Sequence, residues 1–77
     1  MNKINVICLR CGNVQIRTDV LEEINDKYIT LNKAIMCSRC NKKTSHIATQ
    51  NVKDLRLKLE KNHNSALDSY VIKLIKR

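Results

Sequence analysis

Four cysteines in two matched pairs are the residues of this chain best suited to chemistry. Residues 8–11 read Cys-Leu-Arg-Cys, residues 37–40 read Cys-Ser-Arg-Cys, and 25 residues separate the pairs. Two thiolates at this spacing can bind one metal ion from a single tight turn, and structural zinc takes four such ligands in a tetrahedron. The spacing therefore predicts one structural Zn²⁺ ion with four ligands: Cys8, Cys11, Cys37 and Cys40.

The residue after each pair supports the same interpretation. A tight turn that points backbone NH groups at the sulfurs closes with a residue at positive φ, which glycine adopts freely and asparagine tolerates best among the others. Gly12, the only glycine of the chain, follows the first pair, and Asn41 follows the second. We therefore predict two zinc knuckles, at residues 8–12 and 37–41.

Disulfide bonding and redox chemistry are two other uses of four cysteines. Stable disulfides need an oxidising compartment, and the apolar stretch 4–9 is too short for the core of a signal peptide. A thioredoxin-type redox pair would stand in a strand–helix–strand context, which the sequence does not show. We therefore expect a cytoplasmic protein with reduced cysteines.

Iron is a second metal that four thiolates suit. Rubredoxin-like iron carriers share the ligand pattern but pack an aromatic core, and this chain has no Phe, no Trp and no Pro. The sequence thus favours zinc over iron, and elemental analysis of the purified protein distinguishes the two metals.

The segments that position the cysteine pairs have the alternation typical of β-strands. β-Branched and apolar residues recur at every second position over 4–8 and again over 14–18. Residues 28–31 and 34–36 precede the second pair, and residues 44–49 follow it. We therefore predict that each pair forms the tip of a β-hairpin.

The segment between the two predicted hairpins, residues 19–27, is polar and acidic. Its pattern fits either one helical turn or an ordered loop. Glu22 and Glu23 within it are expected to be solvated.

From residue 51 the apolar period changes to that of an amphipathic helix. A first helix is predicted over 51–61 with Asn51 as its N-cap, and residues 62–64 are poor helix formers that end it. Ser65, with an aspartate three residues later, resembles a capping box for a second helix that runs to the C-terminus. A single bent helix over 52–77 is the alternative.

These elements predict a small, metal-stabilised α+β fold, with a ribbon of two hairpins over 1–50 and a helical extension over 51–77. Residues 3–49 resemble the zinc-ribbon superfamily, in which two hairpin tips share one zinc ion. The resemblance implies only that the four cysteines are the ligands, since ribbons serve many functions. The chain also resembles the small anti-sigma factor family Gin, although the gap between the pairs is longer here.

The chain has 77 residues and a formal net charge of +8. A single domain of this size buries a small core, so we expect metal binding to be coupled to folding. Basic residues are spread along the chain, which favours nucleic acid or an acidic protein surface as partner. The same charge also serves solubility. Five cations near the predicted knuckles are candidates for phosphate contact: Arg10, Arg17, Arg39, Lys42 and Lys43.

An alternative role for the knuckle arginines is to offset the charge of a zinc–tetrathiolate cluster, which is −2 in total. One side chain can do both. Of the two histidines, His46 is expected on a strand surface and His63 in the turn between the helices, because four cysteines already fill a zinc shell.

The second predicted helix has an apolar face, which is expected by default to pack on the ribbon. A homodimer contact or a partner's groove is the alternative. The candidate interface residues are Leu67, Tyr70, Val71 and Leu74.

No catalytic set is evident, and a zinc ion with four protein ligands has no open position for a substrate or water. No stretch is long enough to span a membrane. We therefore expect a non-catalytic protein that binds nucleic acid or a component of the transcription machinery. The alternative is a protein-binding regulator of anti-sigma type that uses the C-terminal helices.

Overall fold

The first cysteine pair lies at the tip of a hairpin formed by β1 (Ile4–Cys8) and β2 (Val14–Arg17). The second pair lies at the tip of a shorter hairpin formed by β4 (Ile35–Cys37) and β5 (Lys42–Thr44). Both hairpins are antiparallel, as the alternation predicts. The computed structural model describes residues 3–19, 24 and 27–76.

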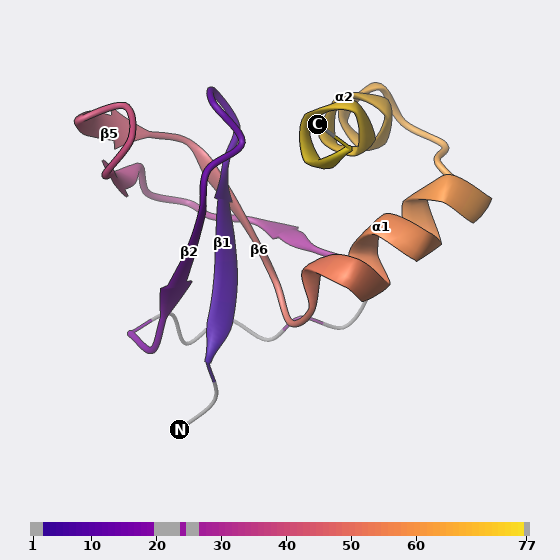
Figure 1. Cartoon of the computed structure of the whole chain (residues 1–77), viewed down its shortest axis with the longest axis horizontal. Coiled ribbons are helices and arrows are strands. Elements are labelled where there is room, and N and C mark those ends of the chain that lie inside the picture. Colours follow the sequence, from indigo (N-terminus) through magenta and orange to yellow (C-terminus); the bar gives the residue numbers. More distant parts are fainter. Residues whose placement is uncertain (1–2, 20–23, 25–26, 77) are drawn as a thin grey trace.

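Two further strands, β3 (Ile29–Thr30) and β6 (His46–Thr49), join the first hairpin rather than the second. The resulting antiparallel sheet has the strand order β2-β1-β6-β3, and β4 and β5 form a separate ladder (Figure 1). Alternation in the sequence does not reveal this pairing, because it carries no information on which strand is the neighbour of which. β1 and β6 are the central strands, and each is paired along both edges.

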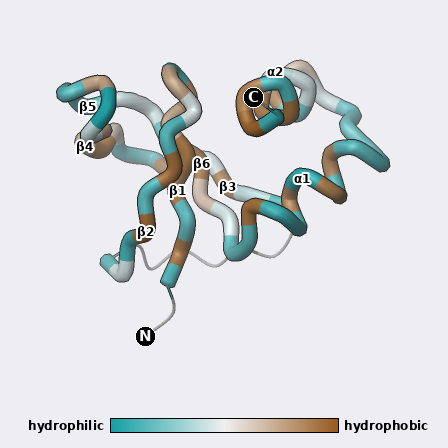
Figure 2. Tube along the Cα trace, viewed as in Figure 1, coloured by the Kyte–Doolittle hydropathy of each residue, from teal (hydrophilic) through white to brown (hydrophobic). Residues whose placement is uncertain are grey.

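The two faces of this sheet carry separate apolar clusters. Ile7 on β1 stands opposite Ile47 on β6, and the two pack with side chains of both helices. Val6 stands opposite Ala48 on the other face, where Ile35 of β4 packs against them. β1 reads Ile-Asn-Val-Ile-Cys, and Figure 2 shows hydrophobic colour along its part nearer the knuckle, as burial on both faces requires. The helices therefore cover one face of the sheet and the second hairpin contacts the other.

The C-terminal region forms two helices, α1 (Val52–Lys61) and α2 (Ala66–Ile75). The side chains of Asn51 and Ser65 each accept a hydrogen bond from the backbone NH three residues on. Both N-caps are the ones predicted, and the alternative of a single bent helix is wrong. Each cap satisfies a backbone donor that a helix start leaves without a partner.

A buried carboxylate, Asp68, connects the start of α2 to the residues before β3. The Tyr28 hydroxyl donates to Asp68 Oδ1 at 2.5 Å, and Lys27 Nζ donates to Asp68 Oδ2 at 3.1 Å. Lys27 Nζ also donates to the Asn62 carbonyl at 3.2 Å. These hydrogen bonds, that of Tyr28 first, lower the pKa of Asp68 to about 2. Lys27, Tyr28 and Asp68 are called the Asp68 cluster below.

The helical turn or loop predicted over residues 19–27 lies mostly outside the described residues, as do Glu22 and Glu23. Among the described residues, no helix combines the length and the apolar character that crossing a membrane requires.

Candidate metal centre

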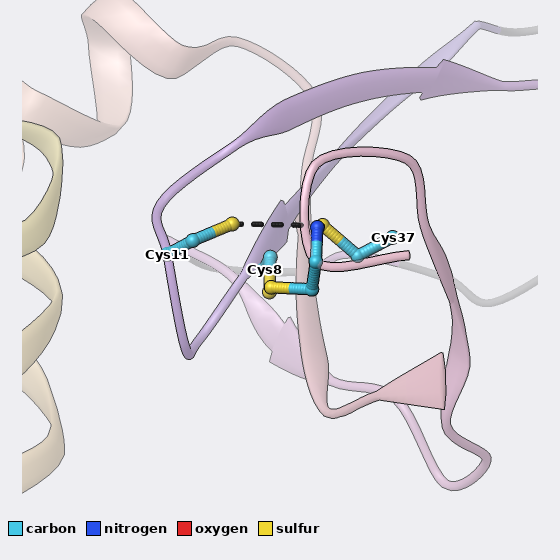
Figure 3. Close-up of side chains that lie close together, drawn as sticks. Cys8, Cys11 and Cys37 are labelled. Atoms are coloured by element: carbon cyan, nitrogen blue, oxygen red, sulfur yellow. Dashed lines mark hydrogen bonds between the residues drawn. The ribbon is translucent and has the colours of Figure 1, made fainter. Parts of the chain in front are cut away.

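The two hairpin tips bring the four cysteine sulfurs together. All four Sγ atoms lie within 4.8 Å of one another, with Cys8 Sγ 3.8 Å from Cys40 Sγ and Cys11 Sγ 3.5 Å from Cys37 Sγ. Figure 3 shows Cys11 facing Cys37 across the gap between the tips. Four sulfurs at about 2.3 Å from one ion in a tetrahedron would be about 3.8 Å apart. The cysteine tetrad therefore fits a single metal ion.

The two tips share one backbone geometry. The Gly12 NH donates to the Cys8 carbonyl at 2.8 Å, and the Asn41 NH donates to the Cys37 carbonyl at the same distance. Gly12 has φ of 79° and Asn41 has φ of 58°. The prediction of positive φ at both positions is confirmed. These turns are called the first knuckle (residues 8–12) and the second knuckle (residues 37–41).

Polar hydrogens are directed at two of the sulfurs. The Arg10 NH lies 3.4 Å from Cys8 Sγ, and the Cys40 NH lies 3.4 Å from Cys37 Sγ. Inside the fold, the Thr44 hydroxyl lies 3.0 Å from Cys8 Sγ and donates to it when the sulfur is a thiolate. Donors of this kind stabilise negative charge on sulfur. Sequence reasoning missed Thr44, which comes from β5 of the other hairpin.

The thiol pKa values diverge within the tetrad. Burial acts to raise the pKa of Cys8, but hydrogen bonds from Thr44 and from backbone NH groups outweigh it and lower that pKa to about 6. The pKa of Cys37 is lowered chiefly by the Cys40 NH. The pKa of the Cys40 thiol is raised to about 12, chiefly by its hydrogen bond to Cys11. Adjacent thiolates repel one another, so four charged sulfurs at neutral pH require a cation among them.

Helix α2 packs directly on the first knuckle. The Tyr70 hydroxyl donates a hydrogen bond to the Leu9 carbonyl. A Cβ atom placed on Gly12 would lie 3.2 Å from Leu74 Cγ. The lack of a side chain at Gly12 therefore permits both the close approach of α2 and the positive φ. In Figure 1 the first knuckle lies between the β4–β5 hairpin and α2.

The prediction that His46 lies on a strand surface is wrong. Its side chain is 0% exposed, because β6 is a central strand with both faces covered. His46 Nδ1 lies 2.9 Å from the Thr44 carbonyl, and Nε2 has no hydrogen-bond partner among the described residues. His63 lies between the two helices as predicted, with Nδ1 2.8 Å from the Leu59 carbonyl.

The structure places four of the five candidate basic residues near the tetrad. Arg10 and Arg39 each precede the second cysteine of a knuckle, and Lys42 and Lys43 lie at the start of β5; all four are exposed. Arg17 lies elsewhere, since it pairs with Ile4 at the end of the hairpin away from the knuckle. Its guanidinium forms an ion pair with Asp19 at 2.6 Å.

The four candidate interface residues divide into two groups. Val71 and Leu74 are buried, at 0% and 6% exposure, and belong to the cluster beneath the helices. Leu67 and Tyr70 are exposed, at 37% and 44%. The apolar face of α2 therefore packs mainly on the sheet, and only the latter two remain on the surface.

The chain was compared with protein-family models, with curated proteins and with solved structures, and none of them matches it.

Proposed function

We propose that this protein is a zinc ribbon that binds nucleic acid without catalysing a reaction. The observation that carries the proposal is the position of two arginines. Arg10 and Arg39 occupy equivalent places in two knuckles whose sulfurs lie as close as 3.5 Å. Both exposed side chains therefore lie at the same end of the molecule, beside the cysteine tetrad, and the protein has a formal charge of +8. Basic groups gathered in this way suit a phosphate backbone.

Zinc is the metal that the tetrad favours. Four thiolates within 4.8 Å of one another suit zinc, and iron is the alternative with the same ligands. The two knuckles on hairpin tips also match the arrangement that defines zinc ribbons. The ion would hold the two tips together, and four sulfur ligands would leave no position on it for water or substrate.

The proposed nucleic-acid surface consists of Arg10, Arg39, Lys42 and Lys43, and is called the knuckle surface below. Among the described residues, none of the four is part of an ion pair. Each phosphate contact releases counterions, so the logarithm of affinity falls with the logarithm of salt by about 0.7–0.9 per contact. Four contacts therefore predict that a plot of the logarithm of affinity against the logarithm of salt concentration falls with a slope of about 3.

The test is titration of short labelled DNA and RNA, single- and double-stranded, with zinc-loaded protein from about 50 to about 200 mM salt. We expect Arg10→Gln with Arg39→Gln to weaken binding by roughly tenfold and to reduce the slope by about 2. The matched control is Arg17→Gln with Arg56→Gln, which removes the same charge at two ion pairs away from the knuckles. Absence of binding to every probe at low salt would contradict the proposal.

Protein binding is the second candidate function, and a groove of about 370 Å³ favours it. Its apolar lining comes from Val14 on β2, Val52 on α1, and Leu74 and Ile75 on α2, and its charged lining residue is Arg39. This combination suits a segment of a partner protein that carries aliphatic residues and an acidic residue. Binding such a segment would make this protein a regulator of anti-sigma type. Capture of a protein partner that survives nuclease treatment and is lost in Val14→Asp would favour this candidate; capture abolished by nuclease would contradict it.

A further inference from the structure

The exposed aromatic ring of Tyr70 lies on the first knuckle. The chain contains no Phe or Trp and two Tyr. Tyr28 is half-buried, and its hydroxyl is bound to Asp68 in the Asp68 cluster. Tyr70 is 44% exposed, and its hydroxyl donates to the Leu9 carbonyl. Tyr70 is therefore the one exposed side chain of the Phe, Trp and Tyr class among the residues that the structure describes.

Two basic residues lie close to Tyr70 in the fold or along the helix. The carbonyl that accepts from Tyr70 belongs to the peptide bond between Leu9 and Arg10, so the backbone of Arg10 lies near the Tyr70 hydroxyl. Lys73 is exposed and stands one helical turn after Tyr70, where side chains three residues apart are neighbours. The described acid of α2, Asp68, is buried and engaged by Lys27 and Tyr28. Basic residues near an exposed aromatic ring suit a base and its neighbouring phosphates.

The ring is also held in place. Its hydroxyl is bound to a knuckle whose backbone is fixed by the Gly12 NH to Cys8 carbonyl hydrogen bond. A fixed side chain loses less conformational freedom when a ligand binds, which increases affinity.

We propose that Tyr70 stacks on an unpaired base, and that the preferred nucleic acid is single-stranded, with Arg10 and Lys73 contacting the phosphates on either side of that base. This inference rests on the proposed nucleic-acid function and extends the knuckle surface onto α2. Bases within a duplex are already stacked on one another, so a duplex offers Tyr70 no free face.

The test compares a short oligothymidylate with an oligonucleotide of the same length in which every nucleoside is abasic. Both carry the same phosphates, so purely electrostatic binding does not distinguish them. Stacking predicts that the zinc-loaded protein binds the oligothymidylate about tenfold more tightly, since each stacked base contributes a factor of this order. Equal affinities would overturn this inference and leave the proposed function intact. No binding to either would also overturn this inference, while binding to the duplex and RNA probes described above would decide the proposed function separately.

Two variants connect the preference to the ring. Tyr70→Leu removes the aromatic face and is expected to abolish the difference between the two probes. Tyr70→Phe keeps the face without the hydroxyl and is expected to retain it. Circular dichroism and zinc content establish that each variant is folded. If Tyr70→Leu does not fold, Tyr70→Phe and the wild-type comparison remain decisive. If folded Tyr70→Leu still prefers the oligothymidylate over the abasic strand, the inference is overturned.

Discussion

Thr44 supports the metal centre from outside the ligand set. Its hydroxyl lies 3.0 Å from Cys8 Sγ and is the polar side chain closest to a ligand sulfur among the described contacts. A donor that hydrogen-bonds a ligand stabilises its charged, metal-binding form and fixes its orientation.

We expect Thr44→Val, which keeps the shape and removes the hydroxyl, to lower zinc affinity by about tenfold. Competition with a chromophoric chelator measures this change. Thr30→Val is the control, because Thr30 is an exposed residue of another strand, β3. Equal zinc affinities of Thr44→Val and the wild type would show that the hydroxyl plays no part in metal binding.

For single residues, the sequence predicts the conformation of those that belong to the knuckle turns themselves. The cysteine spacing and the positions of Gly12 and Asn41 are enough to predict both knuckle turns, because each turn is closed by its own residues. Thr44 and His46 could not be placed in the same way. His46 lies on β6, which pairs with β1, and Thr44 lies on β5 of the second hairpin, against Cys8 of the first; contacts at long range decide both positions.

Helix α2 is held by groups at both ends. The Asp68 cluster fixes its first turn, and the contacts of Tyr70 and Leu74 with the first knuckle fix its later part. Caps and helix boundaries are local features, so the sequence predicts them well. The docking of α2 on the knuckle is not local, and the apolar face alone leaves open whether it packs on the ribbon or on a partner.

The stability that the Asp68 cluster contributes to the fold depends on pH. The pKa of Asp68 is lowered from its ordinary value of 3.8 to about 2, so its carboxylate is bound more strongly in the folded protein than in the unfolded chain. The stability that it contributes is fully present above about pH 4 and is lost as pH falls toward about 2.

We therefore expect Asp68→Asn to reduce the free energy of unfolding by about 1–2 kcal/mol at neutral pH. The difference from the wild type should stay constant down to about pH 5 and shrink only below about pH 4. Chemical denaturation of both zinc-loaded proteins between about pH 7 and about pH 5, where the thiolates still hold the ion, measures the constant part of this difference. Asp54→Asn is the control, since Asp54 pairs with Lys58 on an exposed face. A difference that already disappears near neutral pH would contradict the assignment.

The whole molecule depends on a small core shared by its two segments. Ile7 and Ile47 of the sheet pack with Leu55, Leu59 and Val71 of the helices. The division into a ribbon over 1–50 and an extension over 51–77 stays a prediction. The small size of this core leaves little stability once the knuckles are no longer held together.

Metal removal is therefore expected to unfold the protein. A strong chelator should abolish the circular dichroism of the folded chain, and one equivalent of Zn²⁺ should restore it. Cys37→Ser, which removes one ligand, should weaken zinc binding and lower the midpoint of thermal unfolding. Ser38→Ala is the control within the same knuckle. Full retention of structure in the presence of chelator would show that the core suffices without metal.

The contact between α2 and the first knuckle has a consequence for the order in which a nascent chain matures. All four sulfur ligands precede Tyr70 and Leu74 in the direction of synthesis. At about 5–20 residues per second, the ribosome makes α2 some 2–7 s after the second knuckle. During that interval the first knuckle lacks the helix that later covers it. The docking of α2 is thus the later event by necessity, and α2 meets a knuckle whose sulfurs have already been made.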